Sequence, residues 1–570
     1  MRVTCAALLV TLCVHVSSAQ NQNANGEGSF KLTILHTNDI HSRILESDKR
    51  GVQCNDEKRK KGKCYGGVAR IAYQVRKLKK AARNVLFVNA GDFFQGTLWY
   101  SILKHKIVSA AMSQMHYDVV CLGNHEFDDG PEGLAPFLRI MKERGVRVLG
   151  TNLDTTAEPS FKGIDLPKST VYTIEGHQIA FLGVVTTETI TIAKPGRIQI
   201  LPEVGSINRE IERLKRQNIN TFFLISHVGF DVDQKIAAAC PDLDLIIGGH
   251  TNTFLYKGQP PVDDKPEASY PFVYKRPDGT YCLIVQDYRF GKYLGYLSME
   301  ISRKGVVTHW AGNPILLSQE IPQDMRVLES MMPYKKIVDD AITRSVGSTK
   351  VVLEADGKLC RYRELKEELA LKHPICFRER LHTETFCPVI FVTSSVQKST
   401  KRCPPGRMSD HGANVTLGDL LGAMPYDSDL VVMNMRGKDL WKMFEYGVSD
   451  FTWYPDLNGK FLQVSGARVI YDFRQPNGQR VVSLKILCAN CSIPVYKPVR
   501  DNKVYSIVTT SFMANGGDGF KFGPNVTKRT EGVSAMDVFS KYFTKMSPVK
   551  TPEEDRVIVL NLPKRGNNSS

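Results

Sequence analysis

Short apolar runs, each followed at once by polar side chains, recur along the first half of the chain. They lie at residues 31–35, 85–88, 119–122, 222–225 and 243–247. Runs of this length that are rich in β-branched and large apolar residues are typical of buried strands. Ligands at the carboxyl ends of neighbouring strands share one crevice, so we expect the polar residues after these runs to converge.

Helix-like segments alternate with these runs from about residue 30 to residue 320. Residues 69–82 and 208–216 place apolar side chains near a 3.6-residue period, which predicts helices, and Gly and Pro mark the joins. The alternation predicts an α/β (α+β) fold. We expect a layered β-sandwich flanked by helices over residues 30–320.

The chain beyond residue 320 predicts a second unit. Residues 314–322 have prolines at both ends and indicate an exit loop, and residues 325–346 carry apolar side chains at helical spacing. We therefore expect a connector helix within residues 321–346. A second, smaller α/β domain for substrate binding is expected at residues 347–550, followed by a polar tail at residues 551–570.

The two ends of the chain indicate export. Residues 1–19 resemble a secretory signal, with Arg2 at the start, an apolar run at residues 6–16 and small residues before the cleavage point. That run is too short to cross a membrane, and no later run reaches about 20 residues. The polar tail lacks the hydrophobic stretch of a lipid-anchor signal. We expect a secreted, extracellular protein without a membrane anchor.

Composition supports a globular, multidomain protein. The chain has 570 residues, a net charge of +16 and 24% charged residues. Its basic residues gather at residues 58–61 and 70–83 without interleaved aromatics, which favours a solvated loop and helix face over nucleic-acid binding. Attraction of acidic ligands or anionic cell surfaces remains the alternative.

Cysteines and glycosylation motifs agree with export. Of thirteen cysteines two fall in the signal, which leaves eleven in the mature chain. We expect Cys54 to pair with Cys64 and Cys488 with Cys491, and Cys121 to be a buried thiol, because an oxidising compartment favours disulfides. Glycosylation motifs begin at Asn414, Asn490, Asn525, Asn567 and Asn568.

The polar residues after the apolar runs are of the types that bind divalent metals. On an extended segment Asp39 and His41 share a face, and the carboxylate of Asp92 can bridge two ions. The expected ligand set is Asp39, His41, Asp92, Asn124, His227 and His250. We expect two adjacent metal sites that share Asp92. Paired metals stabilise the attacking and leaving oxygens of phosphoryl transfer.

Three further residues fit the same chemistry. His125 would stabilise phosphate oxygens or protonate the leaving group, and Asp128 would orient its ring. Asn252 would add a weak ligand or a hydrogen bond to phosphate. Any one of these residues alone is more often a helix cap or a satisfied core residue. Five strand ends that each carry a suitable side chain favour the metal centre.

The motifs resemble those of a known family. Residues 36–41 (His-Thr-Asn-Asp-Ile-His), 91–92, 123–128 (Gly-Asn-His-Glu-Phe-Asp), 226–227 and 249–252 are similar to the motifs of calcineurin-like metallophosphoesterases. Their order is similar to the 5′-nucleotidase branch, which includes ecto-5′-nucleotidases and secreted apyrases. The resemblance covers most of residues 30–550. It implies the same six ligands, the His125–Asp128 catalytic pair and two divalent ions, with zinc expected first and calcium, magnesium or manganese as alternatives.

The resemblance also implies a nucleotide site in the second domain. Tyr426 and Phe512 would sandwich the base, since bases stack on aromatic rings. Asp518, in the glycine-rich segment 515–519, would bind the ribose hydroxyls, and Arg361 would contact the phosphate end. Core packing of the two aromatics is the alternative.

Residues 365–411 depart from the family pattern. The family usually carries an Asn-Gly-Gly-Gly-Ile-Arg loop here, and this chain has none before the resemblance resumes near residue 412. The segment is either divergent or shifted in reading frame at the nucleic-acid level. Part of the nucleotide-binding wall and the pairing of four cysteines stay open, namely Cys360, Cys376, Cys387 and Cys403.

These observations predict a secreted, metal-dependent hydrolase of extracellular nucleotides. The first expectation is an apyrase that converts ATP and ADP to AMP, as in the saliva of blood feeders, where removal of ADP blocks platelet aggregation. One alternative is a 5′-nucleotidase that converts AMP to adenosine. Another is a catalytically weak scavenger that binds nucleotides. The oligomeric state is left open.

Overall fold

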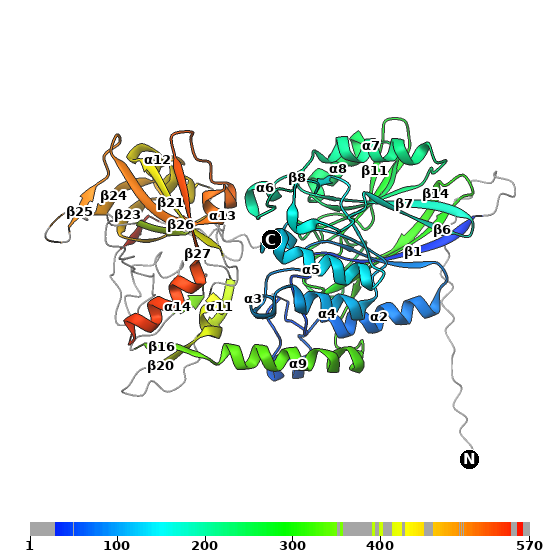
Figure 1. The fold of residues 1–570 in the computed structure, drawn as a ribbon, viewed down its shortest axis with the longest axis horizontal. Helices are drawn as coiled ribbons and strands as arrows, with labels where there is room; N and C mark the ends of the chain where they lie inside the picture. The colour runs from blue at the N-terminus through cyan, green and yellow to red at the C-terminus, as the bar shows by residue number, and fades with distance from the viewer. Residues whose placement is uncertain are drawn as a thin grey trace, which may run out of the picture.

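The chain folds into two lobes joined by one long helix (Figure 1). The computed structural model describes residues 29–49, 51–349, 354–356, 390–393, 398–402, 413–423, 428–449, 460–488, 491, 493, 495–548 and 556–561. The amino-terminal lobe is coloured blue to green and the carboxyl-terminal lobe yellow to red. The green helix α9 (Met325–Ile342) packs along the amino-terminal lobe and leads into the second lobe.

Two mixed sheets form the centre of the amino-terminal lobe. The first has the order β14 (Val307–Gly312), β13 (Tyr293–Ile301), β1 (Phe30–Thr37), β2 (Val85–Ala90), β3 (Val119–Cys121), β4 (Arg147–Leu149). The second has the order β11 (Phe272–Lys275), β12 (Tyr281–Val285), β10 (Leu243–Gly248), β9 (Phe222–His227), β7 (His177–Val185), β6 (Ser169–Ile174). Strands β1 to β4 are parallel, as are β7, β9, β10 and β12.

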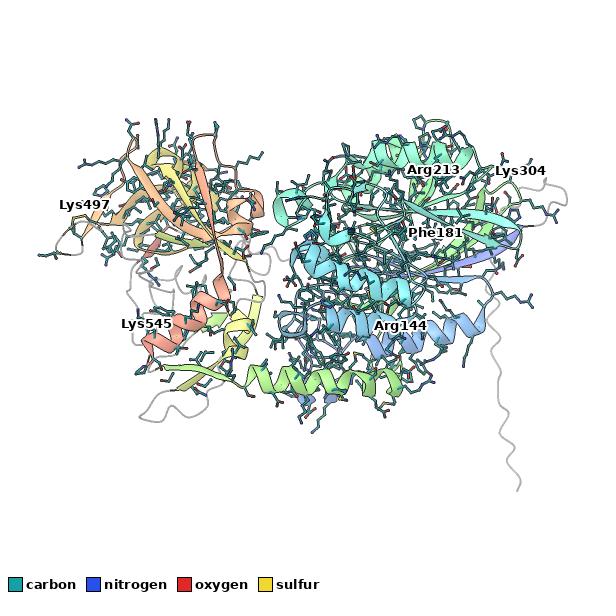
Figure 2. The ribbon with its side chains drawn as sticks, viewed as in Figure 1. Arg144, Phe181, Arg213, Lys304, Lys497 and Lys545 are labelled. Carbon is teal, nitrogen blue, oxygen red and sulfur yellow. A yellow bond between two sulfur atoms is a disulfide. The ribbon has the colours of Figure 1, made fainter. Side chains whose placement is uncertain are left out.

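Side chains alternate between two buried layers along these strands. On β1, Leu32 and Ile34 pack between the sheets, whereas Leu35 packs toward the helices that cover the first sheet. These helices are α2 (Val68–Ala81), α4 (His105–Met115) and α5 (Gly130–Glu143). Helices α7 (Glu203–Lys215) and α8 (Phe230–Ala239) pack on the second sheet. The predicted layered β-sandwich flanked by helices is confirmed, with Phe181 inside it (Figure 2).

The carboxyl-terminal lobe is smaller and has its own core. One sheet has the order β22 (Gln463–Ser465), β18 (Ile390–Thr393), β26 (Val504–Thr510), β21 (Asp429–Arg436), β27 (Thr527–Ser534). Another has the order β25 (Tyr496–Pro498), β24 (Val481–Leu487), β23 (Ala467–Asp472), β28 (Val557–Leu560). Leu440 and Phe444 of α12 (Gly437–Gly447) pack between these strands. Helix α14 (Ala535–Met546) packs against the segment that contains Val346 and against Leu420 and Leu421.

Shorter elements complete the described chain. They are α1 (Asp56–Lys60), α3 (Leu98–Leu103), β5 (Leu153–Asp154), α6 (Thr189–Ile192), β8 (Gln199–Ile200), β15 (Ile315–Leu316), β16 (Ser345–Thr349), β17 (Glu354–Asp356), β19 (Lys398–Arg402), β20 (Ala413–Thr416), α11 (Leu417–Ala423) and α13 (Ser511–Ala514). Single 3₁₀ turns lie at His125–Phe127, Pro159–Phe161 and Gly517–Gly519.

The connector differs in length from the prediction. Helix α9 begins after the Asp324 cap and ends at Ile342, and Val346 lies instead in β16, which pairs with β20. Apolar spacing alone could not reveal this pairing. The expected exit loop also contains a short strand, β15, which pairs with β13.

The lobes touch beside the connector. Leu98 and Ile102 of α3 pack against the cluster of Val346, Leu420 and neighbours. Lys194 of the amino-terminal lobe also forms an ion pair with the second lobe, in which its Nζ atom lies 2.8 Å from Asp429 Oδ2. The amino-terminal lobe is therefore in direct contact with the second lobe.

Cysteine chemistry follows the prediction where the structure describes it. Disulfides join Cys54 to Cys64 and Cys488 to Cys491, and Cys121 is a buried thiol. Cys240 and Cys282 are also buried thiols. Within the described ranges, no helix has both the length and the apolar character needed to cross a bilayer.

Candidate metal centre

The predicted ligands come from two sheets rather than one. Strands β1, β2 and β3 of the first sheet end just before Asp39, Asp92 and Asn124. In the facing sheet β9 ends on His227 and β10 ends just before His250. Each group uses the carboxyl ends of adjacent parallel strands, so the two sets of loops meet at one edge of the sandwich.

Several of these residues have left-handed backbone conformations. Asp39, His41 and Asp92 have φ values of 50°, 48° and 54°, and that of His250 is 77°. Such conformations cost free energy for residues other than glycine and persist where the surrounding structure imposes them. These turns therefore orient the polar side chains toward the carboxyl ends of the strands.

Asp92 lies between two groups of nitrogen ligands. Its Oδ2 atom is 3.1 Å from His227 Nε2 and 3.8 Å from His41 Nε2. His41 Nε2 is also 3.7 Å from Asp39 Oδ1. One carboxylate therefore faces His41 on one side and His227 on the other.

Asn124 completes the second group. Its side-chain oxygen lies 2.9 Å from His250 Nδ1 and 3.2 Å from His227 Nε2. All six predicted ligands are thus brought together, with His41, Asp92, Asn124 and His227 buried. The structure joins the residues that the strand ends predicted.

The donor set fits two divalent ions. Ligand atoms of Asp92, His227 and His250 lie within 4.8 Å of one another, as do those of His41, Asp92 and His125. Oδ1 of Asp39 is buried without a hydrogen-bond partner, although buried carboxylate oxygens are normally satisfied. A cation beside His41 would satisfy it. By distance alone, either Asp39 or His125 could complete the ligand set of that ion.

Glycines allow this close approach. A Cβ added at Gly123 would lie 2.2 Å from Asp92 Oδ1, and one at Gly249 would lie 2.9 Å from His227 Nδ1. No larger residue could occupy either position without displacing a ligand side chain. The Gly91-Asp92, Gly123-Asn124 and Gly249-His250 pairs therefore have a steric cause.

The protonation states of Asp92 and His227 depend on each other. Burial opposes ionisation of Asp92, but the neighbouring His227 and His125 hold its pKa below the usual range. Burial lowers the pKa of His227, yet Asp92, Asp39 and the Ala90 carbonyl together outweigh burial and raise it to about 9. Without a metal Asp92 and His227 form an ion pair. A divalent cation would replace the proton on His227 Nε2.

Burial also shifts the pKa values of the other two candidate ligands of the first site. Burial lowers the pKa of His41 to about 3, and burial raises the pKa of Asp39. Neutral imidazole is the form that binds metals. His227 Nδ1 lies 2.7 Å from the carbonyl oxygen of Ala90, which orients the ring and leaves Nε2 facing Asp92.

His125 and Asp128 form the expected pair. His125 Nδ1 lies 2.7 Å from Asp128 Oδ2, and the two residues are separated by one helical turn. The His125 ring stands edge-on to the ring of His41, with centroids 5.3 Å apart. The Asp128 carboxylate therefore fixes the imidazole beside the ligand cluster.

Glu126 is a functional residue that the sequence analysis missed. Its buried carboxylate accepts hydrogen bonds from the backbone N–H groups of Asp92, Phe93, Phe94 and Gly123, at 2.6–3.0 Å. The β2 and β3 loops are thereby tied to one side chain. Its place between His125 and Phe127 in the motif was the only available signal.

Two buried amides support the other loops. Asn38 donates to Asp39 Oδ2 at 2.8 Å and to the carbonyl oxygen of Tyr288 at 2.7 Å. Gln286 donates to the carbonyl oxygen of Gly249 at 3.1 Å and accepts from the N–H of Thr253 at 3.0 Å. These contacts position the segments that carry Asp39 and His250.

The predicted nucleotide residues are only partly within the described chain. Phe512 is half-buried on α13, and its ring lies against Gly517, where a Cβ would come within 2.4 Å of the ring. Asp518 follows directly and is exposed, so these two residues are brought together. In Figure 1, α13 lies on the side of its lobe that faces α6. Arg361 and Tyr426 lie outside the described residues.

Asn252 lies on the same loop as the candidate ligand His250. It follows His250 by two residues, with φ at 55°, and its side-chain oxygen is buried without a hydrogen-bond partner. Most of the divergent segment 365–411 lies outside the described residues, as do Cys360, Cys376, Cys387 and Cys403.

Comparisons with known proteins agree with this geometry. Residues 32–254 match the family described as calcineurin-like phosphoesterase, and residues 395–523 match the 5′-nucleotidase C-terminal domain. The chain is 34% identical over 534 residues to the 5′-nucleotidase of Mus musculus, covering 93% of this chain and 90% of that protein. It is 33% identical over 568 residues to the apyrase of Tabanus yao, covering 97% of this chain and 98% of that protein.

A solved structure shows the same fold. The 5′-nucleotidase precursor from Thermus thermophilus superposes with a TM-score of 0.66 at 28% identity, covering 94% of this chain and 100% of that one. Calcineurin-like phosphoesterases use divalent metals, which fits the ligand set above. The chain is thus a phosphohydrolase and belongs to the metallophosphoesterase family of 5′-nucleotidases and apyrases.

Proposed function

We propose that the protein is an apyrase-type enzyme that hydrolyses extracellular ATP and ADP to AMP and phosphate. The observation that carries hydrolysis is the position of Asp92, whose Oδ2 atom faces His227 at 3.1 Å and His41 at 3.8 Å. A carboxylate between two nitrogen groups can serve two ions at once. Such a pair suits phosphoryl transfer to water.

The ligands divide into two sets. Asp39, His41 and Asp92 would hold one ion. Asp92, Asn124, His227 and His250 would hold the other. When bound, divalent ions supply Lewis-acid stabilisation of phosphoryl oxygens and activation of water. Zinc is the first candidate through the resemblance to the family, with calcium, magnesium or manganese as alternatives, because the ligand types alone do not select the ion.

His125 acts on the substrate rather than on the ligands. Asp128 binds Nδ1 of the imidazole, which leaves Nε2 to donate a proton or hydrogen bond to the phosphoryl or leaving oxygen. Asn252 would donate a hydrogen bond from its side-chain nitrogen to a phosphate oxygen, or serve as a weak metal ligand through its side-chain oxygen, which is buried without a hydrogen-bond partner. These groups distribute the negative charge that develops as the P–O bond breaks.

The second domain would hold the nucleoside. Phe512 offers a half-buried ring for stacking, and the adjacent Asp518 can accept hydrogen bonds from ribose hydroxyls. Tyr426 on the opposite face of the base and Arg361 at the phosphates complete the proposed site.

The substrate in this proposal is chosen from the known proteins to which the chain is similar. Similarity to an apyrase over 97% of the chain supports ATP and ADP, and similarity to a 5′-nucleotidase over 93% supports AMP as the second candidate. Phosphate release from ATP, ADP and AMP, measured side by side with metal supplied, decides between them. Cleavage of AMP alone would refute the apyrase assignment.

A catalytically weak scavenger is the third candidate, because residues 365–411 lack the family loop. The complete ligand set and the His125–Asp128 pair argue against it. Calorimetry that finds tight ADP binding, together with no phosphate release, would favour the scavenger.

Export and a role against platelets are part of the proposal. The signal-like residues 1–19, the glycosylation motifs and two disulfides support secretion. Platelets respond to ADP, so the purified protein should block ADP-induced aggregation in platelet-rich plasma. An Asp92→Ala variant should not.

A further inference from the structure

The loop between β12 and β13 packs directly against a proposed metal ligand. The N–H of Phe290 donates to the carbonyl oxygen of Asp39 at 2.8 Å, and Asn38 ties the same loop through Tyr288. Tyr288 and Phe290 have φ values of 85° and 61°. Two left-handed residues around Arg289 indicate a conformation that the surroundings impose.

Arg289 is a cation without an anionic partner among the described residues. Its guanidinium carbon lies 5.0 Å from the ring centroids of both Tyr288 and Phe290. Its Nε atom is buried with no hydrogen-bond partner. The hydrogen bond it does make joins Nη2 to the hydroxyl of Tyr288 at a long 3.4 Å. Two aromatic rings thus hold a guanidinium whose donors are largely unused.

Arg289 lies just outside the metal ligands. The ring of Phe290 is 6.0 Å from the ring of His41, and Arg289 packs on that same Phe290 ring. Arg43 also packs on Phe290, at 3.8 Å, but it donates to the carbonyl oxygens of His41 and Gly51. Arg43 is therefore engaged by the backbone, whereas Arg289 is available to a ligand.

From this arrangement we infer that Arg289 binds a phosphate of the substrate other than the one being cleaved. A guanidinium presents a planar set of donors that matches phosphate oxygens, and an unsatisfied buried donor gains most from an anion. Nucleoside diphosphates and triphosphates carry such a second phosphate, whereas monophosphates do not. Arg289 is then a specificity-determining residue. This inference rests on the proposed function and extends it.

The test compares wild-type full-length protein with Arg289→Ala and with a control. Arg303→Ala removes the same charge from the exposed turn between β13 and β14, next to Lys304, which Figure 2 shows at the edge of the molecule away from the second lobe. For each protein kcat/KM is measured on AMP, ADP and ATP, together with bound metal and Tm. Arg289→Gln keeps part of the aliphatic stem and a polar, uncharged end, and it replaces the alanine variant if that variant does not fold.

Loss of Arg289 should lower kcat/KM for ADP and ATP roughly 10- to 100-fold, the effect of removing a hydrogen bond to a charged group. The value for AMP should stay within about 3-fold, and Arg303→Ala should match wild type on all three. An equal loss on AMP, or no loss on ADP and ATP, overturns the inference.

The wild-type profile reports separately on the apyrase proposal. If wild type cleaves only AMP, the apyrase assignment fails, and ADP is then used as a competitive inhibitor of AMP hydrolysis. The Arg289→Ala variant should raise the inhibition constant of ADP by roughly 10-fold or more. An unchanged constant would overturn the role of Arg289.

Discussion

The carboxylate of Glu126 accepts a hydrogen bond from the backbone N–H of Asp92 at 3.0 Å. The same carboxylate binds the N–H of Gly123 at 2.6 Å, so one side chain couples the two loops that carry Asp92 and Asn124. A buried acid that serves four backbone donors stabilises a loop geometry that metal ligands alone would not impose.

Replacing Glu126 should weaken metal binding without removing any ligand. In Glu126→Gln the amide nitrogen would face backbone N–H donors, which leaves at least two of them unsatisfied. We expect metal affinity to fall roughly 10- to 100-fold, as for other groups that orient ligands. Competition against a coloured chelator measures this. Glu143→Gln, an exposed change on α5, serves as the control and should leave affinity unaltered.

Asp92→Ala should remove both metals and abolish turnover, because its carboxylate faces both ligand groups. Elemental analysis of purified protein should find about two ions per wild-type chain and almost none in the variant. If one ion per chain survives in Asp92→Ala, the shared-ligand assignment is wrong.

His125→Ala should spare the metals and slow the reaction. The expected decrease in kcat is roughly 10²–10⁴-fold, the usual contribution of a general acid or base. Asp128→Asn should cause a smaller decrease, because it only orients the ring through Nδ1. Metal content decides between the two possible roles of His125. Loss of one ion in His125→Ala would mean that His125 is a ligand in place of Asp39.

Asp233 should make stability depend on pH. It is buried, and burial raises its pKa from 3.8 to about 7. The folded state therefore holds a proton that the unfolded state releases, so stability falls as pH rises from about 4 to about 7 and then levels off. Below about pH 4 both states are protonated and the effect vanishes.

Asp233→Asn removes this dependence, because the amide cannot ionise. The Tm of the variant relative to wild type should rise between about pH 4 and pH 7 and stay constant above that range. Thermal unfolding across pH, in buffers of equal ionic strength, gives the comparison. A Tm difference that does not change with pH would show that Asp233 is ionised in the folded protein at all these values.

Many strands of the amino-terminal lobe could be predicted from the local sequence. The apolar runs at residues 31–35, 85–88, 119–122, 222–225 and 243–247 all lie within strands or extend one residue past them, since short β-branched and large apolar runs disfavour other buried conformations. The six candidate ligands were predicted because each closely follows one of these runs. The family resemblance rested on these same short motifs.

The sequence by itself thus determined the positions of these strands along the chain, the candidate ligands that follow them and the expectation of a second domain. Only the tertiary structure decided that the candidate ligands come from two facing sheets and that Glu126 accepts hydrogen bonds from four backbone N–H groups. It also decided that Val346 lies in strand β16 and that Arg289 packs on two aromatic rings without an anionic partner among the described residues. The reason is physical. Periodicity and motifs report on neighbours along the chain, whereas these features arise from contacts between segments far apart in sequence, whose geometry depends on how the layers pack.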